Sequence, residues 1–158
     1  MKKKLFYISI SVTICLIIGF LSSFITQSSV NDWYVTLRKP SFNPPNWLFA
    51  PVWFFLYVSM GVAAGLVWAK GVYHLWVQTA LYHFVFQLLV NAAWSIVFFG
   101  LKEPFWALLV IIILLILLVL TIRWFKVVNK WAAYLLIPYL LWVGFAAVLN
   151  YKIWELNH

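Results

Sequence analysis

The sequence predicts an all-α integral membrane protein, a bundle of five transmembrane helices with a long first loop. The first reason is composition: of 158 residues, 66% are hydrophobic and only 9% are charged. A soluble domain of this size exposes too much surface to accommodate so many apolar residues. The second reason is the presence of five uncharged apolar stretches, each long enough for a helix that crosses a bilayer. We therefore expect lipid, not water, to surround most of the chain.

The apolar stretches also fix the expected helix boundaries. They cover residues 5–26, 47–69, 75–99, 105–122 and 131–151. Only helices and closed barrels satisfy their backbone groups in lipid, and the stretches lack the short alternation of barrel strands. The last three connections are short, so we expect consecutive helices to be antiparallel neighbours in a single domain of residues 1–158.

The first stretch follows Lys2, Lys3 and Lys4 and therefore imitates a signal peptide. Its uncharged part runs for about 22 residues, which is enough for a full span, and no Ala-x-Ala cleavage site follows. We expect a retained helix. The loop of residues 27–46 comes next and is rich in Trp and Pro, which argues against disorder. Because long loops in compact domains are usually functional or disordered, we expect this segment to be functional.

Two features mark the second and third stretches. Gly61 and Gly65 form a Gly-x-x-x-Gly pair that permits close helix approach, either within the chain or in a homodimer. The third stretch carries His83, Gln87 and Asn91 at steps of four, which keeps them within about 80° of one another on a helix. In lipid, such a polar stripe faces protein or a cavity. Interhelical hydrogen bonding and ligand binding both remain open for it.

The fourth and fifth stretches contrast with each other. Between Leu108 and Leu120 the fourth is almost pure Leu, Ile and Val, which indicates a lipid-facing wall without function. The fifth has a slowly turning stripe at fourfold spacing, in which Pro138 is expected to bend the helix toward a cavity. The members of this stripe are Tyr134, Pro138, Trp142, Ala146 and Asn150. Ordinary packing is the alternative for Trp142.

The net charge of +8 arises from 11 Lys and Arg against 3 acids, and these cations flank the apolar spans. Their position indicates membrane topology rather than nucleic-acid binding. One side carries Lys2, Lys3, Lys4, Lys70, Arg123, Lys126 and Lys130. The other side carries Arg38, Lys39, Lys102 and Lys152. The excess predicts a cytoplasmic N-terminus, with the C-terminus and the long first loop outside.

The sequence lacks the residues that several kinds of chemistry require. None of Asp32, Glu103 and Glu155 lies mid-membrane, so a carboxylate proton relay is not expected. The single Cys15 excludes an intrachain disulfide and a Cys-based metal cluster. His83 is the only mid-membrane His, which leaves a single axial haem ligand open but no multi-ligand metal site. We predict no metal site and no required cofactor.

Three motifs together carry a resemblance to a known family. The first is the segment from Trp33 to Trp53, whose core runs Lys-Pro-Ser-Phe-Asn-Pro-Pro-Asn-Trp. The second is Gln-x-x-x-Asn-x-x-Trp-Ser, which begins at Gln87, and the third is the Pro-Tyr-x-x-Trp run that begins at Pro138 and continues to an Asn. With these motifs the chain resembles the tryptophan-rich sensory protein family, TspO/MBR, whose animal members are called translocator protein or peripheral benzodiazepine receptor. The length of the chain and its basic N-terminus resemble those of a bacterial member, which implies that the protein lies in a bacterial cell membrane.

The resemblance implies a five-helix bundle with an internal cavity that the first loop caps as a lid. It implies binding of porphyrins such as protoporphyrin IX, and of synthetic isoquinoline carboxamides. By motif, it places ligand-facing residues at Tyr34, Pro44, Trp47, Trp53, Asn91, Trp94, Trp142 and Ala146. We add Arg38 as a cation at the mouth for porphyrin carboxylates, and Gln87 from the polar stripe.

Three functions follow as alternatives. The chain is expected to be a membrane receptor or sensor for porphyrin-type tetrapyrroles. A light- and oxygen-dependent porphyrin-degrading enzyme that uses Trp53 and Trp142, and a facilitative transporter, are the other two. Sterol is a doubtful ligand, because Val148-x-x-Tyr151 is followed at once by Lys152, without the intervening residue of the cholesterol pattern.

Overall fold

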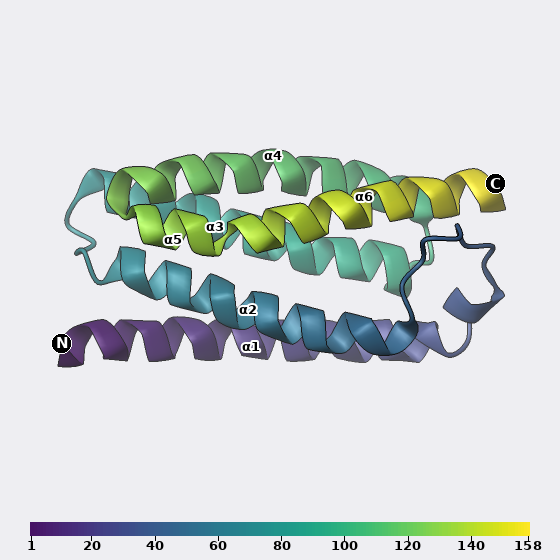
Figure 1. Ribbon diagram of the computed structural model, residues 1–158, viewed down its shortest axis with the longest axis horizontal. Helices are drawn as coiled ribbons and strands as arrows, with labels where there is room; N and C mark the ends of the chain where they lie inside the picture. The colour runs from purple at the N-terminus through teal and green to yellow at the C-terminus, as the bar shows by residue number, and fades with distance from the viewer.

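The computed structural model describes residues 1–158 as a bundle of long helices (Figure 1). The elements are α1 (Lys2–Val30), a 3-10 turn η1 (Tyr34–Thr36), α2 (Asn46–Trp68), α3 (Leu75–Ser95), a π-helical turn η2 (Ile96–Gly100), α4 (Pro104–Val128), α5 (Lys130–Leu135) and α6 (Ile137–Asn157). Five spans are long and apolar enough to cross a membrane, the last formed by α5 and α6 together. The two termini lie at opposite ends, and the lid lies at the end of the C-terminus (Figure 1). The predicted five-helix bundle is confirmed.

Three helices extend at their C-terminal ends beyond the limits expected from the apolar stretches, and α6 continues to Asn157 instead of ending at Tyr151. α1 continues to Val30, so the lid is the shorter segment of residues 31–45. α4 continues to Val128, past the predicted end at Ile122. The added residues include Gln, Arg and Lys, which are good helix formers. Loss of hydropathy therefore marks where a helix leaves the membrane, not where it ends.

The glycine pair of α2 is used for packing inside the chain. A Cβ atom placed on Gly61 would overlap the backbone of Val12, and one on Gly65 would overlap the backbone of Ile8. The two glycines therefore allow the C-terminal half of α2 to come close to the N-terminal half of α1. The alternative of packing within the chain is confirmed for this pair, and a homodimer stays a prediction.

α4 is not simply a wall that faces lipid. Ala107, Ile111, Leu114, Leu118 and Phe125 are buried, at spacings of three, four or seven residues that place them along one side of the helix. This side packs on α3 and α6. The prediction is therefore corrected: one face of α4 meets lipid, while the other contributes to the core of the bundle.

The fifth span is broken rather than merely bent. Leu136 separates α5 from α6, and Pro138 lies in the first turn of α6. At this break the carbonyl of Leu135 accepts a hydrogen bond from Ser59 Oγ of α2 (2.7 Å). In lipid, a break at a proline is tolerated because a neighbouring side chain of this kind satisfies the backbone.

We predict that Gly61→Ala destabilises the bundle by about 1–3 kcal/mol, because the added methyl group overpacks the contact with Val12. Gly144→Ala is the matched control, since a Cβ atom at Gly144 meets nothing within 4 Å. Unfolding in mixed micelles with increasing denaturing detergent measures both. Equal midpoints for the two variants would contradict the role assigned to Gly61.

Candidate functional site

A cavity of about 790 Å³ lies in the half of the bundle next to the lid. Its walls come from α1, α2, the end of α3 with η2, and α6. The volume falls within the range of roughly 300–1,000 Å³ that is usual for small-molecule sites. No lining residue is charged, and 17 of the 26 are hydrophobic, so the cavity is suited to a largely apolar ligand.

Aromatic rings form one continuous surface of the cavity. The ring of Trp53 lies 6.4 Å from that of Trp94, with 30° between their planes, and 5.7 Å from that of Tyr57. The Trp94 ring is held in place by a hydrogen bond, which its Nε1 donates to Asn150 Oδ1 (3.0 Å). Asn150 Nδ2 donates to the carbonyl of Pro104 (2.8 Å). The indole of Trp94 is therefore held by a polar chain that joins α3, α6 and α4.

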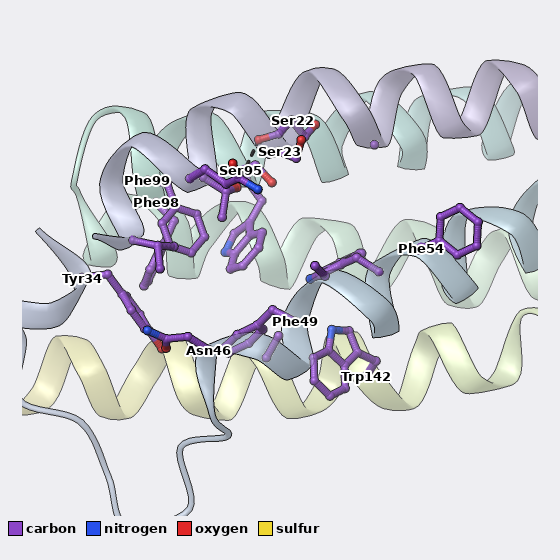
Figure 2. Close-up of a pocket in the computed structure, with 18 of the residues that line it drawn as sticks. Ser22, Ser23, Tyr34, Asn46, Phe49, Phe54, Ser95, Phe98, Phe99 and Trp142 are labelled. Carbon is purple, nitrogen blue, oxygen red and sulfur yellow. Dashed lines mark hydrogen bonds between the residues drawn. The ribbon is translucent and has the colours of Figure 1, made fainter. Parts of the chain in front are cut away.

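Trp142 has the one buried side-chain polar atom that lacks a hydrogen-bond partner. Its ring packs edge-on against Phe49 at 6.1 Å and lies 5.5 Å from Phe145. In Figure 2, the nitrogen lies on the edge of the Trp142 ring turned away from α6. An unpaired buried donor is uncommon in native structures and is one mark of a functional position.

The floor of the cavity is a buried hydrogen-bond network across three helices. Tyr139 Oη of α6 donates to Gln87 Oε1 (2.9 Å) and accepts from Asn91 Nδ2 (2.6 Å). Tyr57 Oη of α2 donates to Asn91 Oδ1 (3.4 Å). Gln87 and Asn91 are almost completely buried. The network closes the cavity on the side away from the lid.

The lid is organised around Tyr34, which is only 3% exposed. Its hydroxyl donates to Asn43 Oδ1 (2.8 Å), and Lys39 Nζ lies 4.8 Å from the centre of its ring. Burial raises the pKa of Tyr34 to about 12, although the hydrogen bond with Asn43 lowers it. The hydroxyl therefore stays protonated, and keeps its role as donor, even at the alkaline pH where an ordinary tyrosine begins to ionise.

The structure brings six of the predicted site residues to the cavity. They are Tyr34, Trp47, Trp53, Trp94, Trp142 and Ala146. They come from η1, α2, α3 and α6, so the aromatic motifs that are far apart in the sequence converge on one space.

Four other predicted residues do not line the cavity. The amides of Gln87 and Asn91 are used in the network below it, so these two residues follow the alternative of interhelical hydrogen bonding. Arg38 is exposed and contacts α6 through its backbone, and Pro44 is half-buried within the lid. His83, considered as a haem ligand, also lies outside, with Nδ1 2.8 Å from the carbonyl of Thr79.

Sequence reasoning missed a polar row on α1. Ser22, Ser23, Thr26 and Gln27 line the cavity, and Figure 2 shows Ser22 and Ser23 opposite Trp142. Their spacing of three and four residues places them on one side of a helix, which was the available signal. Ser23 Oγ donates to its own helix at the carbonyl of Phe20 (2.6 Å), which leaves lone pairs to accept from a ligand.

The cavity also opens sideways between α1 and α2. Phe20, Trp47 and Phe54 line it, yet they are 63%, 71% and 62% exposed. Their outer surfaces belong to apolar spans. An apolar molecule dissolved in the membrane therefore meets the cavity edge directly.

Comparisons with known proteins all point to one family of membrane proteins. Residues 11–155 match the TspO/MBR family. The chain is 41% identical over 157 residues to the tryptophan-rich protein TspO of Chlorobaculum tepidum, covering 99% of both chains. It is 43% identical over 148 residues to the protein of that name from Archaeoglobus fulgidus, covering 93% of this chain and 94% of the relative. It is 36% identical over 140 residues to the translocator protein of Bos taurus, covering 88% and 83%. With five membrane-length helices and a match along nearly its whole length, the chain belongs to the TspO/MBR family.

Proposed function

We propose that this integral membrane protein is a receptor or sensor that binds porphyrin-type tetrapyrroles in the cavity beneath the lid. The observation that carries the proposal is the convergence of Trp53, Trp94 and Trp142 on one uncharged cavity of about 790 Å³. A porphyrin offers a wide aromatic face, and each well-placed aromatic pair contributes roughly 0.5–1.5 kcal/mol beyond burial of area. Membership of the TspO/MBR family, with relatives named translocator protein, supports a membrane receptor or sensor role.

The uncharged lining decides which part of such a ligand is buried. A carboxylate inside the cavity would lose its water without meeting a cation, which is strongly unfavourable. Arg38 and Lys39 lie outside the lining, in the lid, where porphyrin carboxylates at the mouth can reach them. The macrocycle is therefore buried while the acidic edge stays at the surface, and the exposed ion pairs contribute only about 0–1 kcal/mol.

The proposed orientation places the N-terminus in the cytoplasm and the lid outside a bacterial cell membrane. The boundaries of the five spans keep seven Lys and Arg at the N-terminal end, against four at the lid end, which is the usual cytoplasmic excess. A ligand would then reach the lid from outside the cell, or the lateral opening from within the membrane.

Light-dependent degradation of the porphyrin is a second candidate, because Trp53 and Trp142 both line the space that the macrocycle would occupy. A continuous transport path is less well supported. The cavity ends at the network of Gln87, Asn91 and Tyr139, and below it α1 and α2 are in close contact at Gly61.

Replacing cavity indoles tests the site. We expect Trp53→Ala and Trp142→Ala each to weaken protoporphyrin IX binding about tenfold or more, because each removes an aromatic contact and buried area. Fluorescence quenching in nanodiscs measures the affinity. Trp106→Ala is the control, since Trp106 is 58% exposed on α4 and does not line the cavity. Unchanged affinity in both cavity variants would rule out this site.

Esterification of the ligand tests the uncharged lining. The dimethyl ester of protoporphyrin IX should bind at least as tightly as the free acid, because its carboxylates contribute only weak contacts at the mouth. Arg38→Ala should change the affinity for the acid less than threefold and that for the ester not at all. An ester that binds more than tenfold more weakly would show that the cavity recognises the charged groups themselves.

Illumination separates binding from turnover. If Trp53 and Trp142 take part in degradation, oxygen and light should give a discrete open-chain product that Trp53→Phe and Trp142→Phe reduce at least about tenfold. Chromatography of the pigments measures this. Bleaching equal to that produced by free tryptophan would reject catalysis and leave the receptor proposal intact.

A further inference from the structure

The lid is joined to the last turn of α6 by a single side chain. Asn157 Oδ1 accepts a hydrogen bond from the backbone N–H of Arg38 (2.9 Å), and Asn157 Nδ2 donates to the carbonyl of Arg38 (2.8 Å). One amide group thus satisfies both backbone polar groups of one lid residue, as a neighbouring β-strand would do. The two residues are 119 positions apart in the sequence.

Asn157 is itself fixed in the helix that forms a wall of the cavity. Its Nδ2 also donates to the carbonyl of Ile153 (2.7 Å), one turn earlier in α6. Ile153 and Ala146 of the same helix line the cavity. α6 therefore carries both a cavity wall and the group that holds the lid.

Apart from the bond at the start of α2, in which the N–H of Leu48 donates to the carbonyl of Pro45, the lid has no other hydrogen bond to the membrane helices. The side chains of Tyr34, Thr36, Lys39 and Asn43 bond only within the segment of residues 33–44. Phe42 of the lid also packs on Phe145 of α6, with ring centres 6.2 Å apart, and the buried ring of Tyr34 packs on the rings of η2. The lid is therefore a compact unit whose directional attachment to α6 depends on Asn157.

We propose that Asn157 is a positioning residue that fastens the lid over the mouth of the cavity and sets the rate of passage through that mouth. Arg38 and Asn157 are exposed, so water competes for their hydrogen bonds and the attachment can break and re-form. This property suits a gate rather than a permanent closure. The control of ligand exchange rests on the proposed function, whereas the attachment and the access to the cavity can be measured without a ligand.

The first experiment measures the attachment by hydrogen exchange of the whole protein in nanodiscs. In Asn157→Ala, peptides that include Arg38 should exchange at least about tenfold faster, because the N–H of Arg38 loses its acceptor. Peptides from α3 and α4 should be unchanged. His158→Ala is the matched control, since His158 is also exposed at this end and its ring stacks on Trp154 rather than bonding to the lid.

Asn157→Asp separates the two hydrogen bonds and provides a second variant. Its carboxylate still accepts from the N–H of Arg38 but cannot donate to the carbonyl, so exchange should lie between wild type and Asn157→Ala. A merely structural effect would instead lower the unfolding midpoint and speed exchange in α3 and α4 as well. Wild-type exchange of the lid in both variants would overturn the proposal.

The second experiment measures passage through the mouth without a ligand. A water-soluble thiol reagent should label Ala146→Cys at least about tenfold faster when Asn157→Ala is added, because the reagent must pass the lid to reach this cavity position. The native Cys15 is almost fully buried and does not line the cavity, and it is replaced by Ser in both proteins. Equal labelling rates would show that Asn157 does not control access and would overturn the gate.

The third experiment measures how fast the ligand binds and dissociates. Stopped-flow fluorescence with protoporphyrin IX should show faster association and faster dissociation in Asn157→Ala, with a smaller change in Kd, because a gate affects both directions. Unchanged rates despite faster labelling would overturn the link to ligand exchange. Absence of tetrapyrrole binding by the wild-type protein would reject the proposed function, while exchange and labelling would still decide whether Asn157 fastens the lid.

Discussion

Inside a bilayer a polar side chain finds no water, and the hydrogen bonds between the helices of this bundle follow from that constraint. Ser59 bonds the carbonyl exposed at the break of the fifth span. Trp94 bonds Asn150, which continues to a carbonyl of α4. Ser29 bonds the carbonyl of Phe99, beside the π-helical turn. Each irregularity of the backbone therefore lies where a neighbouring helix provides a donor, and these pairs fix how the helices are placed.

The same constraint divides the molecule into a closed half and a hollow half. Near the N-terminus, Gly61 and Gly65 allow α1 and α2 to touch along their backbones, which leaves no room for a ligand. Toward the lid, α2 carries large rings such as Phe49 and Trp53 in place of glycines, and these rings line the cavity. The network of Asn91 and Tyr139 lies at the boundary, where it satisfies its own polar groups and supports the rings above it. The proposed site thus lies at one end of the bundle, because close packing of α1 and α2 leaves no space at the other.

Hydropathy predicted the spans, because apolar length records them directly, whereas the lid and the cavity-facing positions of Trp47, Trp53 and Trp94 followed from the resemblance of their motifs to a known family. Sequence alone did not separate Gln87 and Asn91 from the cavity, since a polar stripe has the same spacing whether its partner is a helix or a ligand. Periodicity also missed Ser22 and Thr26, because small hydroxyl residues bond their own helix and barely lower its hydropathy. Which group a polar side chain bonds depends on tertiary contacts, and a single sequence does not show these contacts.

Opposite sides of the cavity differ in what they can offer a ligand. The row of hydroxyls on α1 presents lone pairs, while the wall of α2 and α6 presents aromatic faces together with the unpaired N–H of Trp142. A flat molecule that lies between them therefore meets acceptors on one edge and a donor on the other, without any full charge. Such a lining favours orientation over strong affinity, since each neutral hydrogen bond contributes only about 0.5–1.5 kcal/mol. Because such a lining holds a ligand only weakly, closure of the mouth by the lid adds to retention on that side, and the attachment of the lid to α6 therefore matters for the site.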